Sequence, residues 1–459
     1  MSSLSFRLKS LVAPKQFYKK VAFVALPITI QHLLNNMMGV VDSIMVSAIN
    51  QVTAVGTALQ LELLVLTIVY GVASGASIYI AQFYGAKDRS GQQKAFGFGL
   101  VLSLIVALVW YLIAHFFGEQ VITFYIKDPE VIASALAYLS IAKYSYFPFA
   151  LLMMFSFAFR SIQKTTIPMI IGVVSMALNI LLNYLLIFGH VGFPQLGVVG
   201  AAYGTLIARV IGVGLYMIYA ISKRESFMGT PKQLLNISKH QWNAMAKRTY
   251  PLIINEFFFG LGSTMFIRFY GTLGTNAMDS YYVGHKLSQM FMFVVMGVNA
   301  ATAAILGADL GKGNLDQAKE NAHHFIGLGL FLSTIMVGII VVLAPVLVGL
   351  YQLDNPLVIE SAIMIVRFFA LRLAFRMFNV MIFASLRAGG DANYLTFIDA
   401  GILWLVGLPL AYILVYFVQL DNLPVILLIV QIEQLVRLVI GSIRVKRGIW
   451  LKNLTHELA

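Results

Sequence analysis

The chain reads GAKDRSGQQKAFGFGLVLS at Gly85–Ser103 and GKGNLDQAKENAHHFIGLGLFLS at Gly311–Ser333. Each stretch is a polar segment that follows one long apolar run and leads into another. The two stretches lie about half the length of the 459-residue chain apart, a spacing typical of two homologous bundles and not of a solenoid of short repeats. We therefore expect a functional site where the two bundles meet.

The composition predicts an all-α integral membrane protein. Hydrophobic residues make up 59% of the chain, charged residues make up 11%, and the mean hydropathy is +0.84. A membrane helix needs about 20 apolar residues. Unbroken runs such as LVLSLIVALVWYLIAHFF at 100–117 meet that need, whereas a membrane β-barrel would show short alternating strands. The chain has no cysteine, which excludes disulfides and thiolate metal sites.

Twelve helical spans are expected, six in each half. Their approximate ranges are 21–48, 54–84, 95–117, 133–160, 166–189, 197–222, 246–272, 279–309, 322–350, 358–386, 393–418 and 423–444. The predicted domains are an amino-terminal lobe at 1–222, a cytoplasmic linker at 223–248 and a carboxyl-terminal lobe at 249–459. The polar linker is expected to be either a solvated tether, which we favour, or a short amphipathic helix on the inner leaflet.

The distribution of Lys and Arg predicts the orientation. These residues gather at both ends and in every second loop, whereas the opposite set of loops holds only Lys127. Because short cytoplasmic loops retain positive charge, both termini are expected in the cytoplasm. The net charge of +13 is then an orientation signal, and no nucleic-acid partner is expected. An even number of spans per half makes the halves parallel repeats, related by a pseudo-two-fold axis along the membrane normal.

Several short motifs follow one another in order across nearly the whole chain. They are Pro27, VVDSIMVSAIN at 40–50, GAKD at 85–88, NILLNYLLIFG at 179–189, GVVGAAYGTLIAR at 197–209, Pro251, GKGN at 311–314 and SLRAGGDAN at 385–393. Together they resemble the multidrug and toxic compound extrusion (MATE) transporters, and the Asp of the first span is similar to that of the bacterial DinF-like branch. The resemblance implies a V-shaped, two-lobe secondary exporter of the bacterial inner membrane. It also implies a small-molecule substrate and a proton or Na+ gradient as the driving force, with no other cofactor.

Asp42 is the first candidate for ion coupling. A carboxylate within a membrane span is costly and usually faces a cavity or a partner. At 100° per residue, Gln31, Asn35 and Asp42 fall within about 40° of one another on the first span. This polar stripe is expected to line the interior of the amino-terminal lobe, with Gln31 and Asn35 in the substrate cavity. Because burial favours the neutral form of a carboxyl group, Asp42 is expected to bind and release a proton.

Glu62 is a second candidate for ion coupling. An antiparallel pair of helices would hold Glu62 of the second span and Asp42 of the first at a similar depth, where the two carboxyl groups could share a proton. The alternative is that both side chains lie close enough to the outer interface to be hydrated. No motif of the family matches Glu62.

The resemblance also implies a polar cluster against Asp42. Asn179 and Asn183, one turn apart on the fifth span, and Thr205 at the start of the sixth match positions of that cluster. The family often has a second Asp where this chain has Asn183, and an amide cannot titrate. We therefore favour protons over Na+ as the coupling ion. The alternative is that the two amides only bond across helices as structural contacts.

The second half carries more cations than anions within its spans. Glu256 and Asp399 are accompanied by Arg372 and Arg376, which lie one turn apart on the tenth span. Another branch of the family has a carboxylate where this chain has Arg376, so a cation site in this half is doubtful and Glu256 is its best candidate. The two arginines either line the substrate cavity with Glu256 and meet an anionic substrate, or pair with Glu256 and Asp399.

Other classes of protein fit the chain less well. The string GxxxxGK[ST] of a nucleotide-driven pump is absent, and no cluster of catalytic residues predicts an enzyme. A channel usually needs oligomeric symmetry, whereas two bundles in one chain enclose a single central cleft. We therefore expect a monomer in contact with membrane lipid. The prediction is an exporter of amphipathic or drug-like compounds. The alternative is a flippase for a lipid-linked or amphipathic anionic precursor, which would use an arginine-lined lobe.

Overall fold

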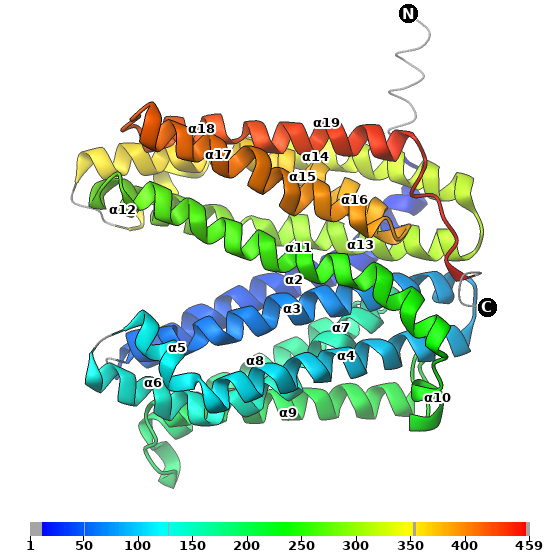
Figure 1. Cartoon of the computed structure of the whole chain (residues 1–459), viewed down its shortest axis with the longest axis horizontal. Helices are drawn as coiled ribbons and strands as arrows, with labels where there is room; N and C mark the ends of the chain where they lie inside the picture. The colour runs from blue at the N-terminus through cyan, green and yellow to red at the C-terminus, as the bar shows by residue number, and fades with distance from the viewer. Residues whose placement is uncertain (1–11, 50, 127, 352–354, 456–459) are drawn as a thin grey trace, which may run out of the picture. The chain divides into compact units, whose positions relative to one another are not determined.

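The computed structural model describes residues 12–49, 51–126, 128–351 and 355–455, which are helical apart from their connections (Figure 1). The chain forms two compact units. Unit 2 is Ile30–Ile253, and unit 1 combines the described residues of Met1–Thr29 with those of Ile254–His456. The lobe boundaries expected from the sequence, at 1–222, 223–248 and 249–459, stay a prediction.

Two long helices each belong to both units. Helix α2 (Lys15–Ser47) contains Pro27 and passes from unit 1 to unit 2 after Thr29. Helix α11 (Lys239–Gly271) contains Pro251 and passes from unit 2 to unit 1 after Ile253. A proline inside a helix removes one hydrogen bond and crowds the preceding turn. In both helices, the boundary between the units therefore lies within one turn of the proline that weakens the helix.

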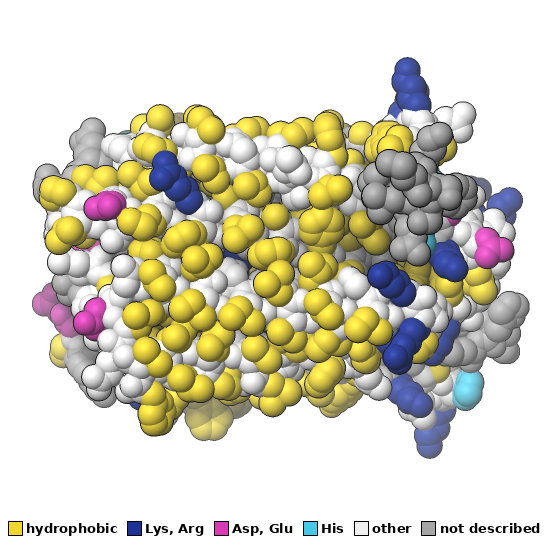
Figure 2. Space-filling view, turned by 90° about the horizontal axis from the view of Figure 1, so that it is seen from above, with side chains coloured by type: hydrophobic (Ala, Val, Ile, Leu, Met, Phe, Trp, Pro, Cys, Tyr) yellow, Lys and Arg dark blue, Asp and Glu magenta, His cyan; other side chains and the backbone are white. Residues whose placement is uncertain are grey.

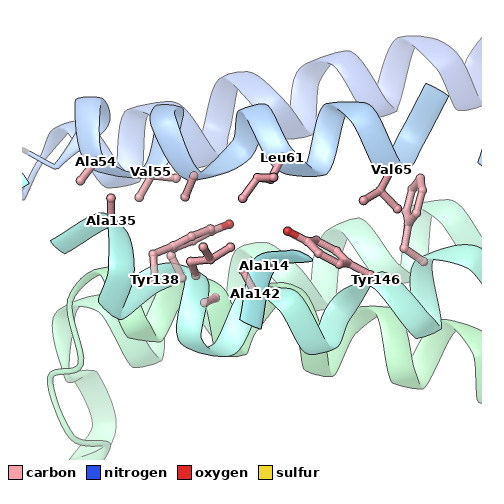
Figure 3. Close-up of a cluster of buried hydrophobic side chains, with 14 of the residues drawn as sticks. Ala54, Val55, Leu61, Val65, Ala114, Ala135, Tyr138, Ala142 and Tyr146 are labelled. Carbon is pink, nitrogen blue, oxygen red and sulfur yellow. The ribbon is translucent and has the colours of Figure 1, made fainter. Parts of the chain in front are cut away.

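Unit 2 is built from a run of packed helices. These are the end of α2, then α3 (Val52–Gly85), α4 (Arg89–Phe116), α5 (Gly118–Tyr125), α6 (Pro129–Ala142), α7 (Tyr146–Ser161), α8 (Thr166–Phe188), α9 (Val198–Ser222), α10 (Pro231–Leu235) and the start of α11. Its core lies between α3 and the pair α6 and α7, where Leu61 and Val65 meet the buried rings of Tyr138 and Tyr146 (Figure 3).

A row of small residues explains how α9 packs on α8. Gly200, Gly204, Ala208 and Gly212 recur every fourth position and so share one face of α9. A Cβ atom built on Gly200 would lie only 2.5 Å from the backbone oxygen of Leu186 on α8. Small residues at four-residue spacing let membrane helices approach closely. The motif GVVGAAYGTLIAR is thus, in large part, a packing surface.

Unit 1 contains one long helical run that is not regular α-helix. Its elements are the start of α2, the end of α11, α12 (Thr275–Gln289), α13 (Met292–Gly311), α14 (Leu315–Gly349), α15 (Pro356–Ala388), α16 (Ala392–Thr396), η3 (Phe397–Gly401), η4 (Leu403–Gly407), α17 (Leu408–Tyr412), η5 (Ile413–Phe417), α18 (Leu423–Val430) and α19 (Ile432–Lys446). The segments η3, η4 and η5 are π-helical, a geometry that often marks functional positions. The first of them contains Asp399.

Eleven helices among the described residues are long and apolar enough to cross a membrane. Helix α15, the tenth expected span, is not among the eleven; it is 33 residues long and carries Arg367, Arg372, Arg376 and Arg387. On the face shown in Figure 2, apolar side chains cover most of the helical surface, and Lys and Arg gather toward one end. The prediction of an all-α membrane protein is confirmed, and the count of twelve spans stays a prediction.

The segment that follows α9 begins by packing against the other helices of unit 2. Phe227 is fully buried among the rings of Phe96 and Phe159. Lys164 lies 2.7 Å from the carboxylate of Glu225, and this carboxylate is buried. The expectation of a solvated tether is therefore wrong for 225–229 of this segment, whereas most of 230–240 is exposed. An aromatic side chain placed four residues after Lys223 anchors it, and α10 is the one short helix that it forms before α11.

Gly200→Ala is predicted to destabilise the protein, since the added methyl group would push against the backbone of α8. We expect a loss of about 1–3 kcal/mol, typical of overpacking. Gly214→Ala on the same helix is the matched control, because its Cβ would meet nothing within 4 Å. The control should be neutral or up to about 1 kcal/mol more stable. Unfolding of the purified variants in mixed micelles checks this, and equal effects at the two glycines would contradict it.

Candidate functional site

Asp42 on α2 begins a chain of polar side chains inside unit 2. Its Oδ1 atom accepts a hydrogen bond of 2.8 Å from Nδ2 of Asn183 on α8. The same Nδ2 atom lies 3.4 Å from Oδ1 of Asn179, one turn earlier. Asn179 in turn donates through its Nδ2 atom to Oγ1 of Thr205 on α9, at 3.3 Å. Four residues singled out in the sequence are thus connected by hydrogen bonds across three helices.

These residues border a cavity of about 200 Å³, which we call the Asp42 cavity. The polar and ionisable side chains in its lining come from α2, α3, α6, α8 and α9, and they are Asp42, Ser43, Glu62, Tyr138, Asn183, Thr205 and Arg209. Apolar residues such as Val46 and Leu59 complete its walls. Asp42 and Glu62 line the same cavity, as expected for two carboxylates at a similar depth on neighbouring helices.

Glu62 forms an ion pair with Arg209. The guanidinium group of Arg209 on α9 donates to Oε1 of Glu62 and, at 2.8 Å, to Oγ of Ser145. It also lies over the ring of Phe149, 5.0 Å from the ring centroid. The side chains of Glu62 and Arg209 are only 12% and 18% exposed. The sequence analysis did not single out Arg209, although the rule that selected Asp42, a charge within an apolar span, applies to it equally.

The side-chain oxygen of Asn183 is buried and accepts no hydrogen bond from the described residues. A Cβ atom built on Gly204 would lie 2.2 Å from this Oδ1 atom. The glycine of α9 therefore makes the space that this amide occupies. A buried carbonyl oxygen without a donor is costly unless a water molecule or a cation meets it. The position beside Asp42 thus offers a carboxylate and a free amide oxygen.

Gln31 belongs to a separate set of contacts. The side chain of Gln31 is buried; its Nε2 atom donates to the backbone oxygen of Pro168 at 3.1 Å, and its Oε1 atom accepts from Arg160 at 2.8 Å. These contacts hold α2 against α7 and α8, and Gln31 does not line the Asp42 cavity. Asn35 lies on α2, but its side chain is outside the described part of the chain. The assignment of these two residues to a substrate cavity stays a prediction.

The charged side chains of unit 1 form a buried network around Asp399. Its Oδ1 atom accepts a hydrogen bond of 2.8 Å from Arg437 on α19, and its Oδ2 atom accepts from Nδ2 of Asn255 at 3.2 Å. Arg437 is completely buried and also donates to Glu433 at 3.2 Å. Gln434 donates to the other oxygen of Glu433 and accepts from Asn379. Sequence reasoning missed Arg437 and Glu433, although they lie one turn apart within an expected span.

The three predicted residues of unit 1 differ in their partners. Arg376 lies 3.6 Å from Asp399 and 5.2 Å from the centroid of the Phe259 ring, while Glu256 lies 4.0 Å from Arg387. Arg372 stacks on Phe369 at 5.5 Å and has no ion pair among the described residues. Two of the three thus take part in internal ion pairs, and Arg372 keeps a positive charge without a carboxylate against it.

The comparisons with known proteins agree on one family. The family model described as MatE matches the chain twice, at residues 27–185 and 251–413. The uncharacterized transporter YisQ of Bacillus subtilis is 26% identical over 84% of this chain and 85% of its own. A probable multidrug resistance protein NorM of Thermotoga maritima is 27% identical over 88% of this chain and 87% of its own. An outward-facing structure of a multidrug resistance MATE family transporter of the MOP superfamily shares the fold, with a TM-score of 0.83 at 19% identity over 96% and 98% of the two chains.

Glu62→Gln and Arg209→Gln are each predicted to destabilise the protein, because each leaves the other charge buried without its partner. The double variant should lose less than the sum of the two, with a coupling free energy of about 1–3 kcal/mol. Unfolding of the four proteins in mixed micelles measures this cycle. Glu119→Gln, which removes an exposed acid at the start of α5, is the control and should have little effect. Additive effects of the two substitutions would show that the pair contributes nothing.

Proposed function

The chain belongs to the MatE family of membrane transporters, and from that premise we propose that it is a secondary active exporter of amphipathic or drug-like organic compounds. The chain is a multi-pass membrane transporter and not an enzyme. The name of its relative NorM, a probable multidrug resistance protein, supports this substrate class. The excess of Lys and Arg in alternate loops supports cytoplasmic termini in a bacterial inner membrane. The Asp in the first span supports the DinF-like branch.

The observation that carries the proposal is the ionic arrangement of the Asp42 cavity. Of the two carboxylates in its lining, Glu62 is neutralised by Arg209, while the hydrogen-bond partner of Asp42 is an amide. An amide stabilises a carboxylate without cancelling its charge. Asp42 is therefore the acid in this cavity whose charge an incoming cation would neutralise, and gaining or losing that cation changes the net charge of the site.

A proton fits this arrangement better than Na+. Oδ1 of Asp42 accepts a hydrogen bond from the amide of Asn183. The N–H group occupies the position from which a metal ion would bind this oxygen. Hard cations prefer several oxygen ligands, often more than one of them anionic. Here the second carboxylate is held by Arg209, so one carboxylate and the Oδ1 atom of Asn183 are the main oxygen ligands left. We propose antiport against protons, with Na+ as the less favoured ion.

The proposed mechanism is alternating access. Substrate enters from the cytoplasm or the inner leaflet, and protonation of Asp42 from outside then favours a bent α2 and substrate release. Pro27 supports this step because the helix lacks one hydrogen bond there and bends at lower cost. Gln31 ties the following turn of α2 to α7 and α8, so bending at Pro27 would leave the site around Asp42 intact.

A flippase for an anionic amphipathic precursor is the second candidate. Arg372, which lacks an ion pair among the described residues, favours it, since a guanidinium group binds phosphate well. Against it, Arg376 and Arg437 are balanced by Asp399 and Glu433, and this leaves little net positive charge for a substrate. The exporter is therefore preferred.

Asp42→Asn is predicted to abolish efflux driven by a proton gradient, because an amide cannot bind or release a proton at Asp42. We expect at least about a 100-fold loss of rate, the lower end of the range seen when an acid–base group is removed. Proteoliposomes with pH and Na+ gradients imposed separately, and a fluorescent cationic dye as substrate, provide the measurement. Asp421→Asn in the exposed loop before α18 is the matched control and should transport normally.

Three results would change the proposal. Normal efflux by Asp42→Asn would refute coupling through this carboxylate. Efflux driven by the Na+ gradient alone would replace the proton with Na+. Translocation of a fluorescent anionic lipid by the native protein, with no dye efflux under either gradient, would favour the flippase.

A further inference from the structure

Unit 2 contains a second and larger cavity that shares no residue with the Asp42 cavity. Its volume is about 970 Å³. Its walls are formed by the sides of α4, α7 and α9, which contribute Phe96, Leu100, Leu151, Phe155, Met217 and Ile221. Met217 and Ile221 are also well exposed on the outside of α9. Because the cavity opens beside exposed apolar residues of an expected membrane span, we call it the lipid-side cavity.

Two arginines stand at one end of the lipid-side cavity. Arg89 is the first residue of α4, and Arg224 follows the end of α9. The Nη2 atom of Arg89 lies 3.4 Å from the backbone oxygen of Arg224, which brings both residues to the same rim. No acidic residue lines the cavity, and neither arginine has an ion pair among the described residues. Charge and apolar surface are therefore separated along the cavity, with the cations at the level of the helix ends.

The segment between α9 and α11 forms a further wall of the lipid-side cavity. Met228, Gly229, Thr230 and Leu234 all belong to its lining. Nε2 of Gln93 donates to the backbone oxygen of Met228 at 2.9 Å, and a Cβ atom built on Gly97 would lie 2.0 Å from the backbone oxygen of Leu234. Thr230 and Gln233 cap α10 reciprocally. The cavity is thus bounded by a fixed wall and not by a loose loop.

We propose that the lipid-side cavity binds one anionic phospholipid, with its phosphate between Arg89 and Arg224 and its acyl chains along Leu100, Leu151 and Met217. Guanidinium groups bind phosphate oxygens through paired hydrogen bonds. Basic pockets between membrane helices on the cytoplasmic side bind anionic headgroups. The volume also lies within the range of about 300–1,000 Å³ that is usual for small-molecule sites. This inference does not depend on the transported substrate or on the coupling ion.

The backbone at Arg224 makes glycine a useful substitution for the test. Arg224 has a φ of +48°, in the left-handed region where glycine is favoured and other residues are strained. The fold alone would prefer glycine at this position. Arg224→Gly removes the charge and relaxes the backbone, so that loss of binding can be separated from loss of folding.

The test is lipid binding by the purified full-length protein, measured by native mass spectrometry. Palmitoyl-oleoyl phosphatidylglycerol and palmitoyl-oleoyl phosphatidylcholine are titrated separately. Two basic residues near a membrane surface, at about 1 kcal/mol each, give roughly a 30-fold preference for the anionic lipid. Arg89→Gln with Arg224→Gly should remove this preference while leaving thermal stability equal or higher. Leu100→Trp, which fills the apolar wall, should weaken binding of phosphatidylglycerol with both arginines present.

The matched control removes two neighbouring positive charges that do not line the cavity. Lys87→Gln with Lys223→Gln should keep the preference for phosphatidylglycerol. Equal binding of the two lipids by the native protein would overturn the proposal, as would a preference that survives in the arginine double variant. Competition by glycerol phosphate at concentrations similar to those of the lipid would show that the acyl chains contribute nothing, and would also overturn it.

Discussion

Charged side chains on apolar helices have to find partners inside the protein, and this constraint organises both units. An isolated charge in a membrane span is costly, whereas a pair with satisfied hydrogen bonds is tolerated. Unit 2 places Arg209 against Glu62 and Ser145, and unit 1 places Arg437 between Asp399 and Glu433. These contacts tie helices that are far apart in the sequence. The positions of α3, α9 and α19 therefore follow from electrostatics as well as from apolar packing.

The same constraint makes the two units chemically different. In unit 1, Asp399 and Glu433 are matched by Arg376 and Arg437, and a completely buried guanidinium group lies at the centre. In such a network, removing one charged side chain leaves its partner buried without a counter-charge. In unit 2, Glu62 is matched in the same way, but the charge of Asp42 is met by an amide. A change in the charge of Asp42 therefore breaks no ion pair among the described residues, and this supports the proposed coupling role.

The sequence predicted the polar chain of unit 2 well and the ion pairs less well. Asp42 was found because a carboxylate is rare in an apolar span, and Asn179, Asn183 and Thr205 were found because the resemblance implies a polar cluster at their positions. Glu62 and Arg209 are 147 positions apart in the sequence, and only the packing of α3 against its neighbours shows that they meet. Gln31 shares a helical face with Asp42 by angle alone, yet it lies three turns away and contacts other helices. Helical periodicity predicts the face on which a side chain lies, whereas the residues that it contacts depend on the tertiary structure.

Helix α9 connects the features that matter most in unit 2, and its small residues explain how. Gly200 and Gly204 let its backbone approach α8 so closely that the amide of Asn183 fits against Gly204 while still reaching Asp42. That close approach also fixes the depth of Arg209, one turn after Thr205, opposite Glu62. Helix α9 continues from Arg209 to Ser222, about 20 Å along the helix axis at 1.5 Å per residue, and Arg224 follows its end. Because α9 packs closely on α8, one packing surface positions both Arg209 and the helix end that leads to Arg224. The motif at 197–209 therefore has a structural role that its residue types alone do not reveal, because glycines that bring two backbones together also determine which polar atoms can meet.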